Sequence, residues 1–146
     1  MIRLKRLLSS LFIFIVLLSA CSDENIGEGA TPEEAVYDLT GFVDEVINIY
    51  DLTNISEYRK ISIFKARFQE EEPFFIADIR KDSSNKWFVN EAIEIGEPSK
   101  ENLTKETEGN NVGGGFTIED VDVIESEYEY IVKIEEIELD VWINFK

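Results

Sequence analysis

Carboxylates are the groups with which this chain could do chemistry, because it has 31 Asp and Glu residues, one cysteine and no histidine. Histidine is the commonest general base and zinc ligand, so its absence removes the usual hydrolytic triads and zinc sites. Oxygen ligands suit calcium, but the ordered spacing of an EF-hand loop is absent from the acid-rich segment near the C-terminus. We interpret this segment as a solvated strand face and expect no metal and no cofactor. Its acids are Glu119, Asp120, Asp122, Glu125, Glu127 and Glu129.

Two other motifs could support catalysis, and both lack the partners that they would need. The glycines at 113–115 are not followed by the lysine and hydroxyl residue of a phosphate-binding loop, so a turn is the simpler interpretation. Ser83 and Ser84 have no histidine to activate them, which leaves only an arrangement with Lys81 or Lys86. We therefore expect no catalytic residue in either motif.

Trp142 is the residue best suited to contact a partner. Val141, Ile143 and Phe145 alternate around it, which predicts a C-terminal strand with one buried face that is paired within a sheet. Trp142 is out of phase with them, on the polar face. Either a second layer covers it, or it is an exposed partner contact, a position in which tryptophan is enriched.

The first 21 residues have the three parts of an export signal. Basic residues lie within 1–6, an almost wholly apolar run covers 7–18, and small residues precede Cys21. The apolar run is shorter than the roughly 20 residues that span a bilayer. A secretory signal is therefore a better interpretation than a transmembrane anchor.

The tetrad Leu18-Ser19-Ala20-Cys21 resembles the lipobox of bacterial lipoproteins. The resemblance implies cleavage between Ala20 and Cys21 and attachment of lipid to the Cys21 thiol. It places the protein on the extracytoplasmic face of the cell membrane. Two acyl chains hold a protein durably at a bilayer, whereas one chain binds only marginally.

The part that would remain after removal of residues 1–20 is strongly acidic. It holds all 31 acidic residues and 11 of the 14 basic ones, a net charge of −20 against −17 for the whole chain. Such a charge makes nucleic acid an unsuitable partner and disfavours lying flat on anionic lipid. It favours a basic protein or another envelope component as partner.

The predicted fold is of the α+β class, with an N-terminal helix packed on an antiparallel β-meander and a β-rich C-terminal part. Residues 21–30 are predicted to be a flexible tether, and residues 31–146 an acidic domain with a potential break at 96–115. Thr31, Pro32 and Glu34 are typical of a capped helix start. The helix is expected to continue to about Glu45, before a strand to Leu52.

Further strands are predicted at 58–68, 74–80 and 87–95, followed by a mobile glycine-rich loop at 109–115. In the second half of the chain the alternation changes phase at Glu135 and Glu136, which indicates a bulge or a tight bend. Three sets of residues are each expected to share a face. In the strand at 58–68 these are Ile61 and Ile63 on one side and Phe64, Ala66 and Phe68 on the other. In the strand at 87–95 they are Trp87, Val89, Ile93 and Ile95.

The chain also resembles small lipoproteins of Bacillus and its relatives, through the lipobox, the TPEEAV helix start and the FIADIRKDSSNKWFVNEAIEIG hairpin. Such families pack a helix against an antiparallel sheet and have no assigned activity. We therefore predict a lipid-anchored, non-catalytic binding or interaction domain. The alternative is a carboxylate-dependent hydrolase of the cell envelope, with or without calcium, which would need two or three acids gathered in a cavity.

Overall fold

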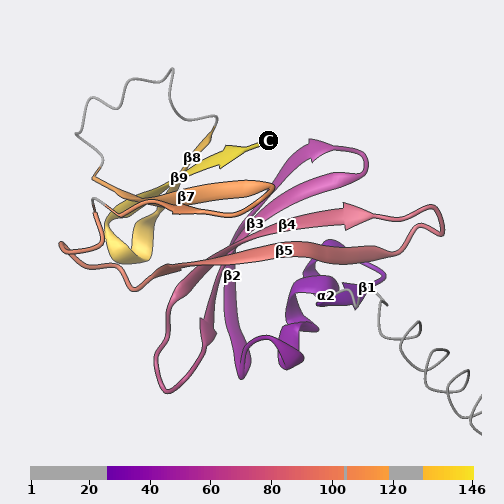
Figure 1. The fold of residues 1–146 in the computed structure, drawn as a ribbon, viewed down its shortest axis with the longest axis horizontal. Helices are drawn as coiled ribbons and strands as arrows, with labels where there is room; N and C mark the ends of the chain where they lie inside the picture. Colours follow the sequence, from indigo (N-terminus) through magenta and orange to yellow (C-terminus); the bar gives the residue numbers. More distant parts are fainter. Residues whose placement is uncertain (1–25, 104, 119–129) are drawn as a thin grey trace, which may run out of the picture.

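Two antiparallel sheets packed face to face make up most of the protein, and short helical segments cover the outer face of the larger sheet (Figure 1). The computed structural model describes residues 26–103, 105–118 and 130–146. Of these residues, 58% are in strands and 11% are helical. The predicted α+β class, a helix packed on a meander, is therefore wrong, and the protein is mostly β.

The predicted start of the helix is confirmed, but its length is not. Helix α2 (Pro32–Tyr37) begins with a capping box in which the Glu34 amide donates to Thr31 Oγ1 (3.2 Å) and the Thr31 amide donates to the Glu34 carboxylate (3.3 Å). It is followed by one 3₁₀ turn, η1 (Leu39–Gly41), and not by helix to Glu45. Asp38 and Gly41 are weak helix formers, and the β-branched residues from Val46 onward favour a strand.

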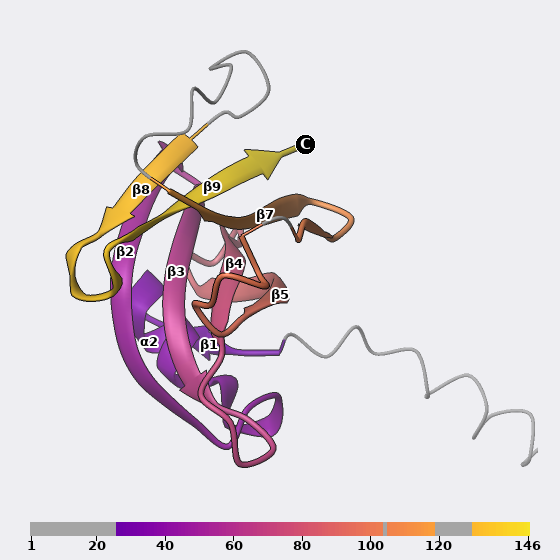
Figure 2. The same cartoon turned by 90° about the vertical axis from the view of Figure 1, so that its left-hand side faces the viewer.

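The larger sheet has the strand order β1-β5-β4-β3-β2 and is curled (Figure 2). It holds five strands: β1 (Glu28–Gly29), β2 (Glu45–Ser56), β3 (Arg59–Arg67), β4 (Phe74–Lys81) and β5 (Trp87–Gly96). The strand that was predicted to end at Leu52 is longer than expected, because β2 continues to Ser56.

Strand β1 lies within the residues predicted to be a tether. Glu28 and Gly29 pair with Phe88 and Trp87, so residues 26–30 belong to the folded part, and the rest of the predicted tether lies outside the described residues. A glycine is needed here, because a Cβ on Gly29 would be 2.4 Å from the Cβ of Glu34. The close approach of helix and edge strand is a tertiary contact, which the polar composition of the segment does not reveal.

The smaller sheet has the order β6-β7-β9-β8. Its strands are β6 (Thr107–Glu108), β7 (Val112–Thr117), β8 (Tyr130–Ile134) and β9 (Leu139–Phe145), and the 3₁₀ turn η2 (Glu135–Ile137) joins the last two. The bend predicted at Glu135 and Glu136 is confirmed, and so is the paired C-terminal strand, since β9 lies between β7 and β8.

The predicted mobile loop at 109–115 is wrong from Val112 onward, because β7 is a fully buried strand. Its glycines allow the two sheets to touch. A Cβ on Gly114 would lie 2.2 Å from Ile76 Cδ1 and 2.6 Å from the carbonyl oxygen of Trp142. Glycine thus marks close approach of backbones here, which is one of its two usual meanings inside a strand.

Two apolar cores lie on the two faces of the larger sheet. The first packs α2 and η1 against the sheet, and the second lies between the sheets. The predicted faces of β3 are confirmed, because Ile61 and Ile63 are in the second core while Phe64 and Ala66 are in the first. Strand β4 is buried on both faces from Phe74 to Ile79.

The common face predicted for the four residues of β5 is wrong. Trp87 and Val89 point into the first core, whereas Ile93 and Ile95 point into the second. The register with β4 shifts here, since Asp78 pairs with Glu91 and Ile79 pairs with Val89. The extra residue between them reverses the alternation, as a β-bulge does.

Candidate functional site

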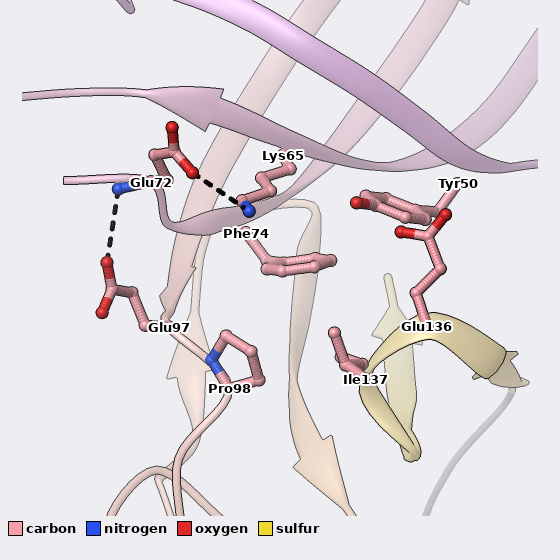
Figure 3. Close-up of a pocket in the computed structure, with 8 residues that line it drawn as sticks. All are labelled: Tyr50, Lys65, Glu72, Phe74, Glu97, Pro98, Glu136 and Ile137. Atoms are coloured by element: carbon pink, nitrogen blue, oxygen red, sulfur yellow. Dashed lines mark hydrogen bonds and ion pairs between the residues drawn. The ribbon is translucent and has the colours of Figure 1, made fainter.

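A hollow of about 450 Å³ opens between the larger sheet and the η2 turn of the smaller one (Figure 3). Five separate parts of the chain contribute to it: β2, β3, the β3–β4 connection with the start of β4, the segment after β5, and η2. We call it the pocket. The lining residues are Tyr50, Lys65, Glu72, Phe74, Glu97, Pro98, Glu136 and Ile137.

Aromatic rings form one wall of the pocket. Tyr50 stacks on Phe74 with ring centroids 5.1 Å apart and an angle of 28° between the planes. Phe74 is 1% exposed and meets the edge of Phe116 at 5.7 Å, so the wall is continuous with the core between the sheets. Stacked rings with an open face offer apolar area and the negative face of a π-system to a ligand.

Charged side chains stand around this wall. Lys65 Nζ is 3.1 Å from Glu72 Oε2, in an ion pair whose side chains are 27% and 46% exposed. The Glu72 amide donates to Glu97 Oε1 at 3.3 Å, which brings a second carboxylate to the same rim. Figure 3 shows Glu136 extending from η2 toward the Tyr50 ring. The lining of the pocket therefore holds three carboxylates and one ammonium group.

The phenol of Tyr50 is the titratable group that the pocket perturbs. Burial raises the pKa of Tyr50, and the hydrogen bond and negative charge of Glu136 act in the same direction. A hydrogen bond with Asn48 and the charge of Lys65 oppose this rise in pKa. The Tyr50 hydroxyl is consequently protonated at neutral pH, so it can donate a hydrogen bond to an acceptor in the pocket.

A second polar cluster lies at the other end of β4 and is built differently. Asp78 is fully buried, and its carboxylate accepts hydrogen bonds from Arg59 Nε (2.7 Å), Arg80 Nε (2.9 Å) and Asn90 Nδ2 (3.0 Å). Arg59 also donates to the backbone oxygens of Lys146 (3.0 Å) and Asn111 (3.2 Å), which directly follow β9 and precede β7 of the smaller sheet. This cluster joins the sheets and leaves no open carboxylate face for a ligand.

Several residues singled out in the sequence lie outside the described part of the chain. These are Ala20 and Cys21 and the whole acidic set from Glu119 to Glu129. Among the described residues, no group of three or more His, Cys, Asp or Glu side chains is arranged to hold a metal ion. Within the same residues there is also no helix long and apolar enough to cross a bilayer.

Trp142 is not an exposed partner contact, because it is only 6% exposed. Its indole lies along Gly115, where a Cβ would be 3.1 Å from Trp142 Nε1 and 2.5 Å from the carbonyl oxygen of Lys105. The segment before β6 therefore forms the covering layer. Of the two interpretations that the sequence left open, this structure supports the second layer.

The serine–lysine arrangement does not form either. Ser84 Oγ donates to Asp82 Oδ1 at 2.7 Å, and the amides of Ser84 and Lys86 donate to the same oxygen. These bonds shape the turn between β4 and β5, and the Lys86 ammonium pairs with Glu28. The hydroxyl of Ser84 thus has a structural partner in the turn.

The pocket residues were missed because they converge from five segments of the chain. One signal was present: Lys65 continues the inward phase of Ile61 and Ile63 on β3. A charged residue at an inward strand position needs a partner or an opening to solvent, so it marks a gap in the core.

The chain matches no protein-family model, no curated protein and no solved structure. What the pocket can do therefore has to be inferred from its own chemistry. An aromatic wall beside an excess of carboxylates suits a ligand that has an apolar stem and a positively charged end.

Proposed function

We propose that the protein is a lipid-anchored, extracytoplasmic binding domain without catalytic activity. The pocket would receive a basic side chain of a protein or envelope partner. The observation that supports this most strongly is the stacked pair of Tyr50 and Phe74 with three carboxylates around it. The anchor is supported by the lipobox-like tetrad ending at Cys21.

A lysine or arginine side chain fits the chemistry of this pocket. Its methylene stem would pack on the aromatic wall, and its cation would meet Glu136 and the ring faces. Glu72 is already engaged by Lys65 at 3.1 Å, so Glu136 is the carboxylate that we assign to the incoming charge. The net negative charge of the chain would also attract a basic partner from a distance.

The anchor is tested by expressing the full chain in a bacterium grown with an alkyne-tagged fatty acid. We expect the label on the parent and on Ser22→Ala, a neighbouring control, but not on Cys21→Ala. Label on Cys21→Ala, or equal processing and membrane retention of all three proteins, would contradict the anchor.

The pocket is tested with Nα-acetyl-lysine methyl ester and its neutral isostere, the methyl ester of Nα-acetyl-2-aminoheptanoic acid, in which a methyl group replaces the ammonium. Each is titrated by calorimetry against the full chain in detergent. We expect the lysine probe to bind about tenfold more tightly, since a charge-assisted contact contributes about 1.5–3 kcal/mol. Glu136→Gln should remove this preference. Glu138→Gln, the same change on an exposed residue outside the pocket, should keep it.

Equal affinity for the two probes would count against a cation site. The hydrolase alternative would use the same carboxylates. Release of sugar or peptide fragments from isolated cell envelopes, lost in Glu136→Gln, would favour it over simple binding.

A further inference from the structure

We propose that the end of the larger sheet farthest from the pocket rests on anionic lipid headgroups of the membrane that holds the protein. This end comprises residues 57–60 and 79–88, and we call it the hairpin end. The inference rests on the proposed anchor at Cys21, and it adds a surface, an orientation and a lipid class to it.

The position of the hairpin end follows from where the described chain begins. Glu28 and Gly29 pair with Phe88 and Trp87, and the Lys86 ammonium pairs with Glu28. In Figure 1 the β4 arrow points to this end, and β1 lies just below it. Cys21 is five residue steps before Ile26, so a lipid on Cys21 could be attached at most about 18 Å from the start of the fold.

The hairpin end is basic although the protein is strongly acidic. Its two ranges contain five basic and two acidic residues. Arg59 and Arg80 share the buried carboxylate of Asp78, and Lys86 pairs with Glu28. Two of the lysines have no carboxylate partner within the described residues: Lys60 and Lys81 lie over the Trp87 ring, at 5.6 and 5.3 Å from its centroid. The basic residues are Arg59, Lys60, Arg80, Lys81 and Lys86, and the acidic ones are Glu57 and Asp82.

The hairpin end also presents an aromatic side chain of the kind found at membrane interfaces. Tyr58 is 55% exposed at the β2–β3 turn. Its carbonyl oxygen accepts a hydrogen bond from the Lys81 amide at 2.9 Å, which holds the turn beside the lysines. Tyrosine is enriched at headgroup level, where its ring is half apolar and its hydroxyl remains hydrated.

The opposite end reinforces this orientation. We call it the pocket end, and it comprises residues 65–73, 94–101 and 135–138. These ranges contain nine acidic and three basic residues. An anionic leaflet attracts the hairpin end and repels the pocket end, so the two effects turn the molecule in the same direction. The pocket would then point away from the membrane, where a partner can reach it.

The orientation is tested on vesicles to which the full chain is coupled through Cys21, its only cysteine, by a maleimide lipid. Acetylation of each lysine by a water-soluble reagent is followed by mass spectrometry. With about 30% phosphatidylglycerol in phosphatidylcholine we expect Lys60, Lys81 and Lys86 to react about fivefold more slowly than on phosphatidylcholine alone. Lys100 and Lys105 should react equally on both, and about 1 M NaCl should abolish the difference.

Two variants with the same change in net charge distinguish an effect of the hairpin end from an effect of the total charge of the protein. Lys60→Gln/Lys81→Gln should lose the protection of Lys86, and Lys100→Gln/Lys105→Gln should retain it. Equal rates on both vesicles, or equal loss in both variants, would overturn the inference. Chemical coupling to the vesicle replaces lipidation in the cell, so the two experiments fail independently. If the chain takes up no fatty acid in cells, only the proposed anchor is refuted. If the lysines of the hairpin end are not protected from acetylation on anionic vesicles, only the proposed orientation is refuted.

Discussion

The two ends of the larger sheet place charged groups in opposite situations. Next to the hairpin end, the carboxylate of Asp78 is fully buried and accepts hydrogen bonds from three side chains. At the pocket end Lys65 and Glu72 are partly exposed and line an open hollow. A buried charge needs partners, so the cluster around Asp78 maintains the fold. The charged groups of the pocket are still in contact with water, which a ligand can replace.

The comparison also shows why one net charge describes this protein poorly. The value of −17 is a sum over the whole chain, and within its described residues the charges are unevenly distributed. The pocket end holds an excess of acids, and the hairpin end has more basic than acidic residues. Fields fall off within about 10 Å at moderate salt, so a membrane or partner responds to the nearest end and not to the total charge.

The largest expected effect is that of removing the buried carboxylate of Asp78, which lies next to the hairpin end. Asp78→Ala leaves Arg59 and Arg80 without their shared partner, and we expect the free energy of unfolding to fall by about 3–5 kcal/mol. Urea denaturation measures it. Glu45→Ala breaks an exposed pair with Arg67 (2.7 Å, side chains 60% and 50% exposed) and should cost less than about 1 kcal/mol. Similar losses in both variants would contradict a structural role specific to Asp78.

The second effect concerns the contact between the sheets. The two sheets touch at Gly114 and are separated at the pocket. Gly114→Val would force side-chain atoms against Ile76 and the Trp142 backbone, and we expect a loss of about 1–3 kcal/mol. Gly41→Ala is the control, because a Cβ there meets nothing within 4 Å. It should be neutral or stabilise the fold by about 0.4–1 kcal/mol. Thermal unfolding of both variants decides whether the glycine is required by packing.

A smaller effect distinguishes the pocket end by its pH dependence. The pKa of Tyr50 is higher in the folded protein than in the unfolded chain, where it is about 10. The stability that Tyr50 contributes is therefore complete below the unfolded pKa, and it is lost as the pH rises through the folded pKa. Tyr50→Phe should therefore lose less stability above pH 10 than the parent. Glu136→Gln should lower the pKa of Tyr50 in an NMR titration, and Glu138→Gln should leave it unchanged. A pKa of Tyr50 insensitive to Glu136 would argue against their hydrogen bond.

The smallest effect lies in the turn of the hairpin end. The hydrogen bond from Ser84 is the main cause that lowers the pKa of Asp82, and backbone amides of Lys86 and Ser84 add to it. The associated stability is present above the unfolded pKa and is lost as pH falls through the lower, folded pKa. Ser84→Ala should raise the pKa of Asp82 in a carboxyl NMR titration, whereas Ser83→Ala should not. Because the turn lies at the surface of the protein, we expect almost no change in melting temperature.

Sequence reasoning was reliable where the physical cause is local. The capping box of α2 lies within Thr31 to Glu34, and the two faces of β3 follow from the period of two along one strand. The bend after Ile134 was visible as a change of phase, and the last strand as strict alternation. Each of these features depends on residues that are close together in the chain, so their pattern is sufficient to predict them.

The tertiary structure decided what depends on residues far apart. The bulge in β5 reverses the faces of Ile93 and Ile95, the glycines of β7 allow the sheets to meet, and the segment before β6 covers Trp142. The pocket exists only because η2 comes to lie opposite the aromatic wall formed by Tyr50 and Phe74. Register, sheet pairing and cavities are set by non-local packing, which alternation within one segment cannot determine.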